Sequence, residues 1–386
     1  MSAAPANEPE VARTERLAAQ LGERGVDRLL VANHVNLRYL TGFTGTNGLA
    51  LIAPGEPAGA AGRSGSDLAE VGLQRFFTDF RYDTQSTAQV PSLFERRIVP
   101  VDLFEAAATE LAQAQSGRLG FEDGALTVKQ HTRLHELLPE GWVLVPCGGL
   151  VEELREVKEP AELARIRAAA QLADEALRGV LEGGLAGRTE REVAIDLELR
   201  MRRLGADAPS FPSIVAAGSH SALPHAEPRD VAIPHDTLVT IDWGAAHEGY
   251  CSDCTRTYAT GERLPDGARE VYELVLRAQL AGLAAVRPGP TGKEVDLVAR
   301  EVIEAAGHGE HFGHGLGHGV GMEVHEAPRL SRTAGEQPLR AGNVVTVEPG
   351  VYIPGRFGVR IEDLLVVTED GAVVLSGLGK ELTVVS

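Results

Sequence analysis

Four carboxylates and one histidine in the C-terminal part of the sequence are of the residue types that bind metal ions. Asp242, Glu348 and Glu362 each lie within or beside a run of β-branched residues, and Asp253 follows Asp242 by eleven positions. Such runs are typical of strands buried on both faces. A carboxylate in those surroundings is energetically costly unless a cation neutralises it. We therefore expect a cation site here rather than strand-end carboxylates that face water.

The histidine is His318, which lies in a glycine-rich run from 313 to 325 that also contains His314 and His325. Glycine permits close backbone approach, so the run is expected to line a site, and residues 321–325 are expected to form a strand that leaves it. A purely structural glycine-rich turn is the alternative. One imidazole with four carboxylates favours Mn²⁺, Co²⁺, Fe²⁺ or Zn²⁺ over a structural thiolate zinc site.

Four carboxylates are more than one metal ion requires, so the set predicts two metal ions with bridging carboxylates. Such a pair lowers the pKa of a bound water and polarises a substrate carbonyl. His225 and His325 lie outside the expected ligand set. They are candidates to transfer protons or hold substrate, and the alternative for each is a hydrogen-bonded core histidine.

An internal repeat predicts the elements that position these residues. Gly187-Arg-Thr-Glu-Arg-Glu-Val returns as Gly289-Pro-Thr-Gly-Lys-Glu-Val, a shift of 102 residues (289 − 187). In each copy a threonine precedes a glutamate by three positions, which is the capping box of a helix start. Longer amphipathic helices are expected before each copy, at 160–181 and 268–286. A histidine and two carboxylates follow each copy, so the repeat indicates a duplicated α+β unit with one site between its halves.

The first 152 residues are expected to form a separate α/β domain, because short apolar runs alternate with helical patterns. The expected strands are 27–32, 47–54, 96–101, 118–123 and 141–146, and the expected helices include 103–115 and 125–138. A Gly/Pro/Ser loop at 54–67 interrupts the alternation. A charged segment at 152–160 marks the boundary, so the sequence predicts domains at 1–152 and 153–386.

Composition excludes several functional classes. Among 386 residues, 55 acidic residues outnumber 37 basic ones, and the net charge of −18 argues against nucleic-acid binding. No apolar window is long enough to span a membrane. Three cysteines form no disulfide framework and suit a reducing cytoplasm. Cys251 and Cys254 are expected to be packing residues on opposite faces of one strand, because no second pair completes a metal site.

The order Asp242, Asp253, His318, Glu348 and Glu362 resembles the five-ligand signature of the pita-bread metallopeptidases. Segments 221–225, 317–329 and 345–352 are similar to the Xaa-Pro peptidase branch, which comprises aminopeptidase P and prolidase. Segments 36–45 and 78–82 resemble the N-terminal domain of that branch. The likeness covers nearly the whole chain, and the 54–67 loop looks like an insertion. It implies a creatinase/prolidase-like α/β domain followed by an α+β pita-bread catalytic domain with an internal pseudo-twofold duplication.

The resemblance also implies a role for each site residue. Asp242 would bind one metal, His318 and Glu348 the other, and Asp253 and Glu362 would bridge both. His225 and His325 match the proton-transferring and substrate-holding histidines of the family, and His314 matches a third histidine on the substrate side. Arg360 would orient the bridging carboxylates, and Thr255 is a candidate hydrogen-bond partner of a ligand.

The function implied is that of a cytoplasmic, dinuclear-metal-dependent Xaa-Pro aminopeptidase acting on peptides with proline at the second position. Mn²⁺ is the expected metal, with Co²⁺, Zn²⁺ and Fe²⁺ as alternatives, and the family suggests a homodimer. Xaa-Pro dipeptidase activity is the alternative, in which Arg329 would bind the substrate carboxylate; otherwise Arg329 is a surface residue. A creatinase-like metal-independent hydrolase and a non-catalytic interaction module are disfavoured because the ligand set is complete.

Overall fold

The computed structural model describes residues 8–54, 74–100 and 102–386. The chain forms two compact units, Met1–Leu154 and Arg155–Ser386. The loop expected at 54–67 lies outside the described residues apart from Pro54.

The first unit is built on a mixed six-stranded sheet with strand order β4-β3-β2-β1-β5-β6. Its strands are β1 (Arg28–Val31), β2 (Leu49–Ile52), β3 (Gln74–Thr78), β4 (Phe94–Ile98), β5 (Gly117–Phe121) and β6 (Trp142–Pro146). Its helices are α1 (Glu8–Leu21), α2 (His34–Thr41), η1 (Phe80–Tyr82), α4 (Asp83–Gln89), α5 (Leu103–Leu111), α6 (Val128–Leu137) and α7 (Leu150–Arg155). The α/β architecture and the five expected strands are confirmed, whereas β3 was not predicted.

The helices of the second unit follow the sequence repeat. They are α8 (Pro160–Leu181), α9 (Glu190–Leu204), α10 (Ala268–Ala285) and α11 (Gly292–Ala305). Both expected capping boxes form: Thr189 Oγ1 accepts from Glu192 N at 3.1 Å and Thr291 Oγ1 from Glu294 N at 3.2 Å. The backbone of Gly205 is left-handed where α9 ends, a conformation that glycine adopts without strain.

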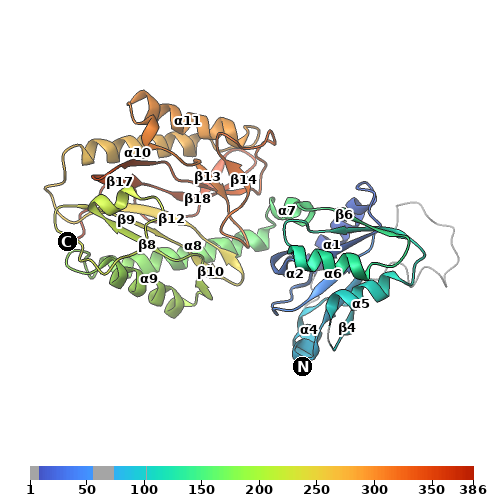
Figure 1. The fold of residues 1–386 in the computed structure, drawn as a ribbon. Helices are drawn as coiled ribbons and strands as arrows, with labels where there is room; N and C mark the ends of the chain where they lie inside the picture. The colour runs from blue at the N-terminus through green and yellow to red at the C-terminus, as the bar shows by residue number, and fades with distance from the viewer. Residues whose placement is uncertain (1–7, 55–73, 101) are drawn as a thin grey trace. The chain divides into compact units, whose positions relative to one another are not determined.

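Antiparallel strands lie between the two helix pairs, with α8 and α9 on one side and α10 and α11 on the other (Figure 1). The strands of the first copy that matter for the site are β8 (Ile214–Ala217), β9 (Leu238–Trp243) and β12 (Cys254–Ala259), in the order β12-β9-β8. The second copy contributes β13 (Gly317–Gly319), β14 (Glu326–Leu330), β15 (Val344–Val347), β18 (Asp363–Val367) and β19 (Ala372–Val374). A hairpin of β16 (Gly350–Ile353) and β17 (Phe357–Arg360) completes it, and shorter elements are β7 (Ala208–Pro209), β10 (Ala245–His247), β11 (Tyr250–Cys251), η2 (Gly218–Ala222) and η3 (Gly309–His311).

Each helix pair packs on its own strands through a separate apolar core. Leu177, Leu197 and Trp243 belong to the core of the first copy, and Val275, Ala299 and Val345 to that of the second. The duplicated α+β architecture expected from the sequence is therefore present. In this architecture, the polar strand ends of the two copies meet between the two cores.

Two local expectations were wrong. Residues 321–325 form no strand: Gly321 N donates to Glu323 O in a tight turn, and the next strand, β14, begins at Glu326. Cys251 and Cys254 do not share a strand either: β11 ends at Cys251 and β12 begins at Cys254, with residues 252–253 outside both strands. In both places the backbone leaves the regular ladder next to a carboxylate or histidine of the expected site.

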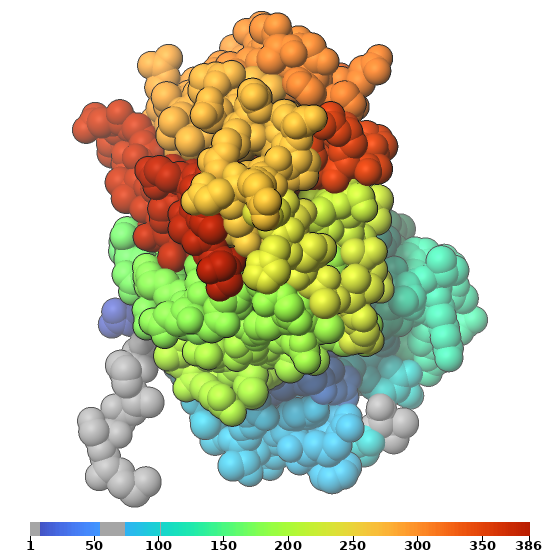
Figure 2. Space-filling view, turned by 90° about the vertical axis from the view of Figure 1, so that its left-hand side faces the viewer, coloured from blue at the N-terminus to red at the C-terminus, as the bar shows by residue number. Residues whose placement is uncertain are grey.

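The C-terminal residues lie on the surface between the first and second helix pairs, where they are red in the space-filling view (Figure 2). Val385 N donates to Ala259 O at 2.7 Å, so the end of the chain pairs with the end of β12. Within the described residues, none of the helices has the length and apolar character needed to cross a membrane.

The paired capping boxes give a test of the duplication. Thr189→Ala and Thr291→Ala should each lower the free energy of unfolding by about 1 kcal/mol, because each leaves a helix N–H without its acceptor. Denaturant unfolding measures the effect. Thr333→Ala is the control, since the Thr333 hydroxyl contacts only the Ser331 hydroxyl in an exposed loop. A loss no greater than that of the control in either variant would contradict the assignment.

Candidate active site

One cavity of about 470 Å³ lies in the second unit and collects every residue that the sequence singled out as a ligand or catalytic group. Its lining includes Asp242, Asp253, His318, Glu348, Glu362, His225, His314, His325 and Arg360. These nine residues span 138 positions of the sequence (362 − 225 + 1) and come from both copies of the repeat. The cavity thus lies between the halves, as the repeat predicted.

Three of the expected ligands lie just outside strands, and the other two lie within strands. Asp242 is in β9, opposite Thr255 of β12 and Ile214 of β8. Asp253 directly precedes β12, and Glu348 directly follows β15. Glu362 occupies the break between β17 and β18, and His318 is the middle residue of β13. A strand end frees the side chain from the alternation of the sheet, so these residues can converge.

His318 is oriented with one ring nitrogen toward the carboxylates. Its Nδ1 lies 3.1 Å from Gly319 O, which can only accept, so Nδ1 carries the proton. Nε2 is then 3.3 Å from Glu348 Oε1 and 3.6 Å from Asp253 Oδ2. One ligand atom each from Asp253, His318 and Glu362 lies within 4.8 Å of the others. This is the spacing and the tautomer that a metal-binding imidazole needs.

The carboxylates form a buried, electron-rich cluster that lacks sufficient positive charge from the protein. Burial, together with repulsion by neighbouring carboxylates, raises the pKa values of Asp253 and Glu362 well above their usual range. Among the described residues, neither Asp242 Oδ1 nor Glu362 Oε1 has a hydrogen-bond partner. Buried carboxylate oxygens are rarely left unpaired in proteins. Divalent cations would complete both the charge balance and the coordination of these oxygens.

Glu348 behaves differently from the other acids. Burial raises its pKa, but the hydrogen bond and charge of His318 outweigh burial and lower the pKa to about 2. For His318, burial lowers the pKa, and the same contact with Glu348 more than compensates and raises it. Thr346 Oγ1 donates to Glu348 Oε1 at 3.2 Å and accepts from His318 N at 3.1 Å. The pair is therefore oriented by a shared hydroxyl.

Arg360 supplies a buried cation to the other side of the cluster. Its Nη2 donates to Asp242 Oδ2 at 2.7 Å, and its Nε donates to Thr255 Oγ1 at 3.0 Å. Thr255 Oγ1 in turn donates to Glu362 Oε2 at 2.6 Å. One guanidinium thus orients a carboxylate from each copy, directly for Asp242 and through Thr255 for Glu362. Thr255 contacts Glu362 rather than Asp253, its neighbour in sequence.

Tyr352 connects Arg360 to His314. Arg360 Nη1 donates to Tyr352 Oη at 2.8 Å, so the phenol must donate its own proton to His314 Nε2, 2.9 Å away. His314 Nδ1 lies 2.8 Å from Gly315 O and carries the ring proton. Burial lowers the pKa of His314, which favours this neutral form. No role was expected for Tyr352, although this residue ends segment 345–352, which resembles the Xaa-Pro peptidases.

His225 and His325 are the exposed histidines of the cavity wall. The His325 ring contacts His318, with ring centroids 4.2 Å apart and the ring planes tilted by 57°, and burial lowers the pKa of His325. His225 belongs to a loop between η2 and β9 whose base is held by Glu190, which accepts hydrogen bonds from His220 and Arg229. Both rings are therefore accessible to a molecule in the cavity.

An apolar wall faces these polar groups, and sequence reasoning missed it. Phe211, Pro212, Ile214, Pro224 and Ala226 line the cavity together with the histidines. Prolines beside His225 were the available signal, but their spacing carries no helical or strand periodicity. An apolar wall opposite a polar cluster suits a ligand with one hydrophobic and one reactive part.

The glycines of the His318 run act as expected. A Cβ at Gly317 would overlap Thr346 O, and one at Gly319 would overlap Ala327 O. β13 therefore fits between its neighbouring strands only without side chains at these positions. Cys251 and Cys254 are buried and held in the thiol form: burial raises the pKa of Cys251 to about 12 and raises that of Cys254 well above its usual range. Cys254 Sγ donates to Glu362 O at 3.2 Å.

Comparisons with known proteins agree with this architecture. The model of metallopeptidase family M24 matches residues 164–369, and that of the creatinase/prolidase N-terminal domain matches residues 13–157. An uncharacterized peptidase from Bacillus subtilis is 42% identical over 372 residues, which cover 96% of this chain and 99% of the relative.

Two solved structures are similar over almost their whole length. The Xaa-Pro dipeptidase from Bacillus anthracis has a TM-score of 0.89 and 39% identity, covering 97% of this chain and 99% of that one. The X-Pro aminopeptidase from Thermotoga maritima has a TM-score of 0.84 and 34% identity, covering 97% of this chain and 100% of that one.

The connection through Tyr352 can be tested with a matched pair of variants. Tyr352→Phe should lower kcat/KM about tenfold, because Arg360 loses an acceptor and His314 a donor while volume is retained. Tyr272→Phe is the control, since its buried hydroxyl donates to Lys380 O away from the cavity. Steady-state kinetics and thermal unfolding of both variants give the comparison. Equal loss of activity in the two would refute a special role for Tyr352.

Proposed function

The chain belongs to metallopeptidase family M24 and carries a creatinase/prolidase N-terminal domain, and on this premise we propose that it is an Xaa-Pro peptidase, which removes an N-terminal residue that precedes proline. The observation that carries the proposal is the single cavity lined by all nine residues expected from the sequence. Relatives named Xaa-Pro dipeptidase and X-Pro aminopeptidase support the same substrate class.

Membership of family M24 implies a divalent metal. We propose that this site would hold two metal ions: Asp242 would bind one, His318 and Glu348 would bind the other, and Asp253 and Glu362 would contribute to both. The two unpartnered buried oxygens on Asp242 and Glu362 support this assignment. A donor set with one imidazole nitrogen and otherwise carboxylate oxygens favours Mn²⁺, with Co²⁺, Zn²⁺ and Fe²⁺ as alternatives. When bound, such ions activate water and polarise the scissile carbonyl.

The chain's own residues orient the reaction. Arg360 holds Asp242 directly and Glu362 through Thr255, so the ligand geometry is set before substrate binds. His225 and His325 are exposed to the cavity and can exchange protons with substrate or hold it. His314 is kept neutral by Gly315 O and Tyr352, so it suits a hydrogen-bonding role on the substrate side.

We propose aminopeptidase action on peptides longer than two residues. A strict dipeptidase must recognise a free carboxylate next to the proline, which calls for an available cation. Among residues 8–54, 74–100 and 102–386, Arg360 is the one arginine that lines the cavity, and it is already bound to Asp242, Thr255 and Tyr352. The wall around His225 is apolar and suits the proline ring.

Dipeptidase action is the second candidate, and one observation favours it. Arg329 is exposed on β14, four residues after His325 and outside the cavity lining. Its charge is the smallest named influence on the lowered pKa of His325, after burial and the charges of His318, Glu348 and His225. Its place in the strand that follows His325 makes it a candidate partner for a substrate carboxylate. Domain limits at 1–152 and 153–386, a homodimer and a cytoplasmic location remain proposals carried from the sequence.

Metal dependence is tested first. Treatment with a chelator should abolish Xaa-Pro hydrolysis, and Mn²⁺ should restore it. Glu348→Gln should lower kcat/KM by more than about 100-fold and reduce bound metal, because loss of a ligand exceeds the effect of losing a group that only orients one. Metal analysis together with kinetics measures both. Glu336→Gln in an exposed loop is the control, and full activity after metal removal would refute the proposal.

Peptide length separates the two candidate activities. Xaa-Pro-Xaa tripeptides should be cleaved at least as efficiently as Xaa-Pro dipeptides, and Arg329→Met should leave tripeptide hydrolysis unchanged. A dipeptidase would instead lose about tenfold or more in kcat/KM for dipeptides in this variant, because a charge-assisted hydrogen bond is removed. Preference for dipeptides combined with that loss would favour dipeptidase action.

A further inference from the structure

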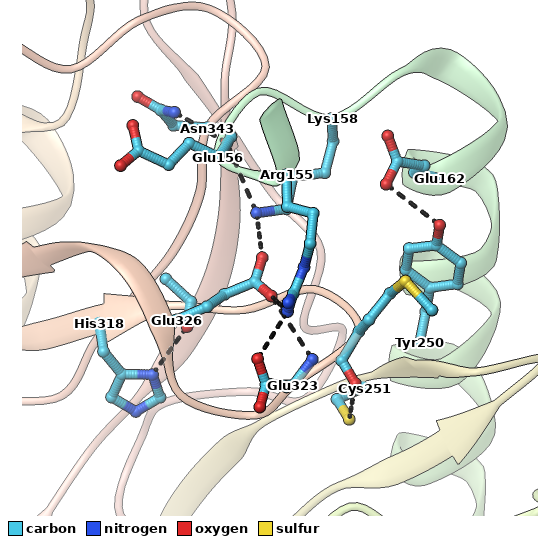
Figure 3. A network of polar contacts seen from close by, with 12 residues as sticks. Arg155, Glu156, Lys158, Glu162, Tyr250, Cys251, His318, Glu323, Glu326 and Asn343 are labelled. Atoms are coloured by element: carbon cyan, nitrogen blue, oxygen red, sulfur yellow. Dashed lines mark hydrogen bonds and ion pairs between the residues drawn. The ribbon is translucent and has the colours of Figure 1, made fainter. Parts of the chain in front are cut away.

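Two buried cations bind the glutamate that directly follows His325. Arg155 Nη2 donates to Glu326 Oε2 at 2.5 Å, and Lys158 Nζ donates to Glu326 Oε1 at 2.5 Å (Figure 3). Arg155 also binds Glu323 Oε2 at 2.8 Å. The side chains of Arg155, Lys158 and Glu326 are only 3%, 1% and 8% exposed, whereas Glu323 is 43% exposed.

The turn that these cations hold lies outside the strands. Residues 321–325 form no regular secondary structure, and among the described residues no side chain hydrogen-bonds the His325 ring. Met322 and Val324 pack on the core that contains Val320 and Val344, and Cys251 Sγ contacts Met322 O at 3.7 Å. The His325 ring itself is located by its contact with the tilted His318 ring and by the backbone of the turn. At its start the turn is held by Cys251 N, which donates to Gly321 O at 2.7 Å. At its end it is held through Glu326.

The cationic segment is itself anchored next to the site. Lys158 N donates to Gly342 O at 2.9 Å, and Asn343 Nδ2 donates to Glu156 O at 2.9 Å. Asn343 immediately precedes β15, which leads to Glu348. Segment 155–158 therefore holds the His325 turn in register with the strand that presents Glu348. Glu326 also pairs with Gly319 across β14 and β13, next to His318.

A cluster of two buried cations with one buried carboxylate and one half-exposed carboxylate is a costly way to obtain stability. Desolvation of the charges offsets much of their attraction, and apolar replacements of similar volume are often no less stable. The same cluster is well suited to hold a loop in one conformation, because bonds to a charged carboxylate are short and directional.

We propose that Arg155 and Lys158 are positioning residues, which act through Glu326 to place His325 against the substrate. The proposal rests on the proposed function, because it assumes that His325 contacts an Xaa-Pro peptide. It assigns a role in the reaction to a segment more than 160 residues away in sequence, which itself lines no part of the cavity.

A double-mutant cycle tests the proposal. Arg155→Met leaves Glu326 bound to Lys158, so the variant should fold and bind metal normally. It should lower kcat/KM for an Xaa-Pro peptide about tenfold or more, since a small misplacement of a catalytic group is sufficient for such a loss. It should change kcat and KM in the same sense as His325→Ala. In the His325→Ala background it should have no further effect beyond about twofold.

Arg340→Met is the matched control, because it removes the exposed ion pair between Arg340 and Glu156 in the same segment at 3.1 Å. It should leave kcat and KM unchanged. Arg155→Lys, which retains a cation, should recover part of the lost activity. If Arg155→Met does not fold, Glu323→Gln is the alternative, because it weakens the cluster from its exposed side. It should lower kcat/KM by a smaller factor, and that loss should again disappear in the His325→Ala background.

Four results would count against the proposal. Equal losses from Arg155→Met in the wild-type and His325→Ala backgrounds, or a loss of bound metal, would show a general structural role and refute positioning. Wild-type activity in Arg155→Met would refute it as well. If His325→Ala itself leaves Xaa-Pro hydrolysis unchanged, the substrate role of His325 is wrong and its positioning falls with it, whereas the absence of Xaa-Pro hydrolysis in the metal-loaded wild-type protein would refute the proposed function itself.

Discussion

Four carboxylates held in one buried place are the constraint around which the second unit is organised. Each would prefer water to the protein interior, and together they repel one another, as the raised pKa values of Asp253 and Glu362 express. The fold offsets this with Arg360, with the hydroxyls of Thr255 and Thr346, and with the imidazole of His318. These groups orient the acids, but one guanidinium cannot balance four carboxylates. The remaining charge is what divalent cations would supply.

A similar device recurs at each histidine of the cavity wall. The loop of His225 is held by Glu190 with Arg229, and that of His325 by Glu326 with Arg155 and Lys158. The loop of His314 is held by Arg300, which is paired with Asp296. The Arg300 guanidinium donates to Phe312 O at 3.0 Å and to His314 O at 2.8 Å. In each case a buried charge fixes the backbone; the rings of His225 and His325 stay exposed, whereas that of His314 is bound to Tyr352 and Gly315 O. Loops that must present a side chain accurately gain from such supports, because apolar packing alone is less directional.

The sequence predicted the charged residues that converge on the cavity more completely than the side chains around them, and the reason is physical. Asp242, Glu348 and Glu362 contrast with β-branched neighbours, so each is conspicuous within a short window. The helices of the repeat begin with capping boxes, which are likewise recognisable within a short stretch of sequence. Arg155 and Tyr352 have no such signal, because their partners lie in other elements: Arg155 and Glu326 are 171 residues apart. The turn at 321–325 was mistaken for a strand because its apolar alternation resembles one, whereas Gly321 closes it by a bond to Glu323 O.

The duplication explains why the site requires the whole second unit. Asp242 and Asp253 come from the first copy, and His318, Glu348 and Glu362 come from the second, so neither copy alone carries all the expected ligands. The contacts that join the copies include Arg360 with Asp242, 118 residues apart, at 2.7 Å, and Thr255 with Glu362 at 2.6 Å. Arginine suits this position better than lysine, since its planar fork binds Asp242, Thr255 and Tyr352 at once, which three rotating ammonium donors on a flexible stem would not do. Ligand geometry and the packing of the two copies are therefore set by the same guanidinium, so a change in one must disturb the other.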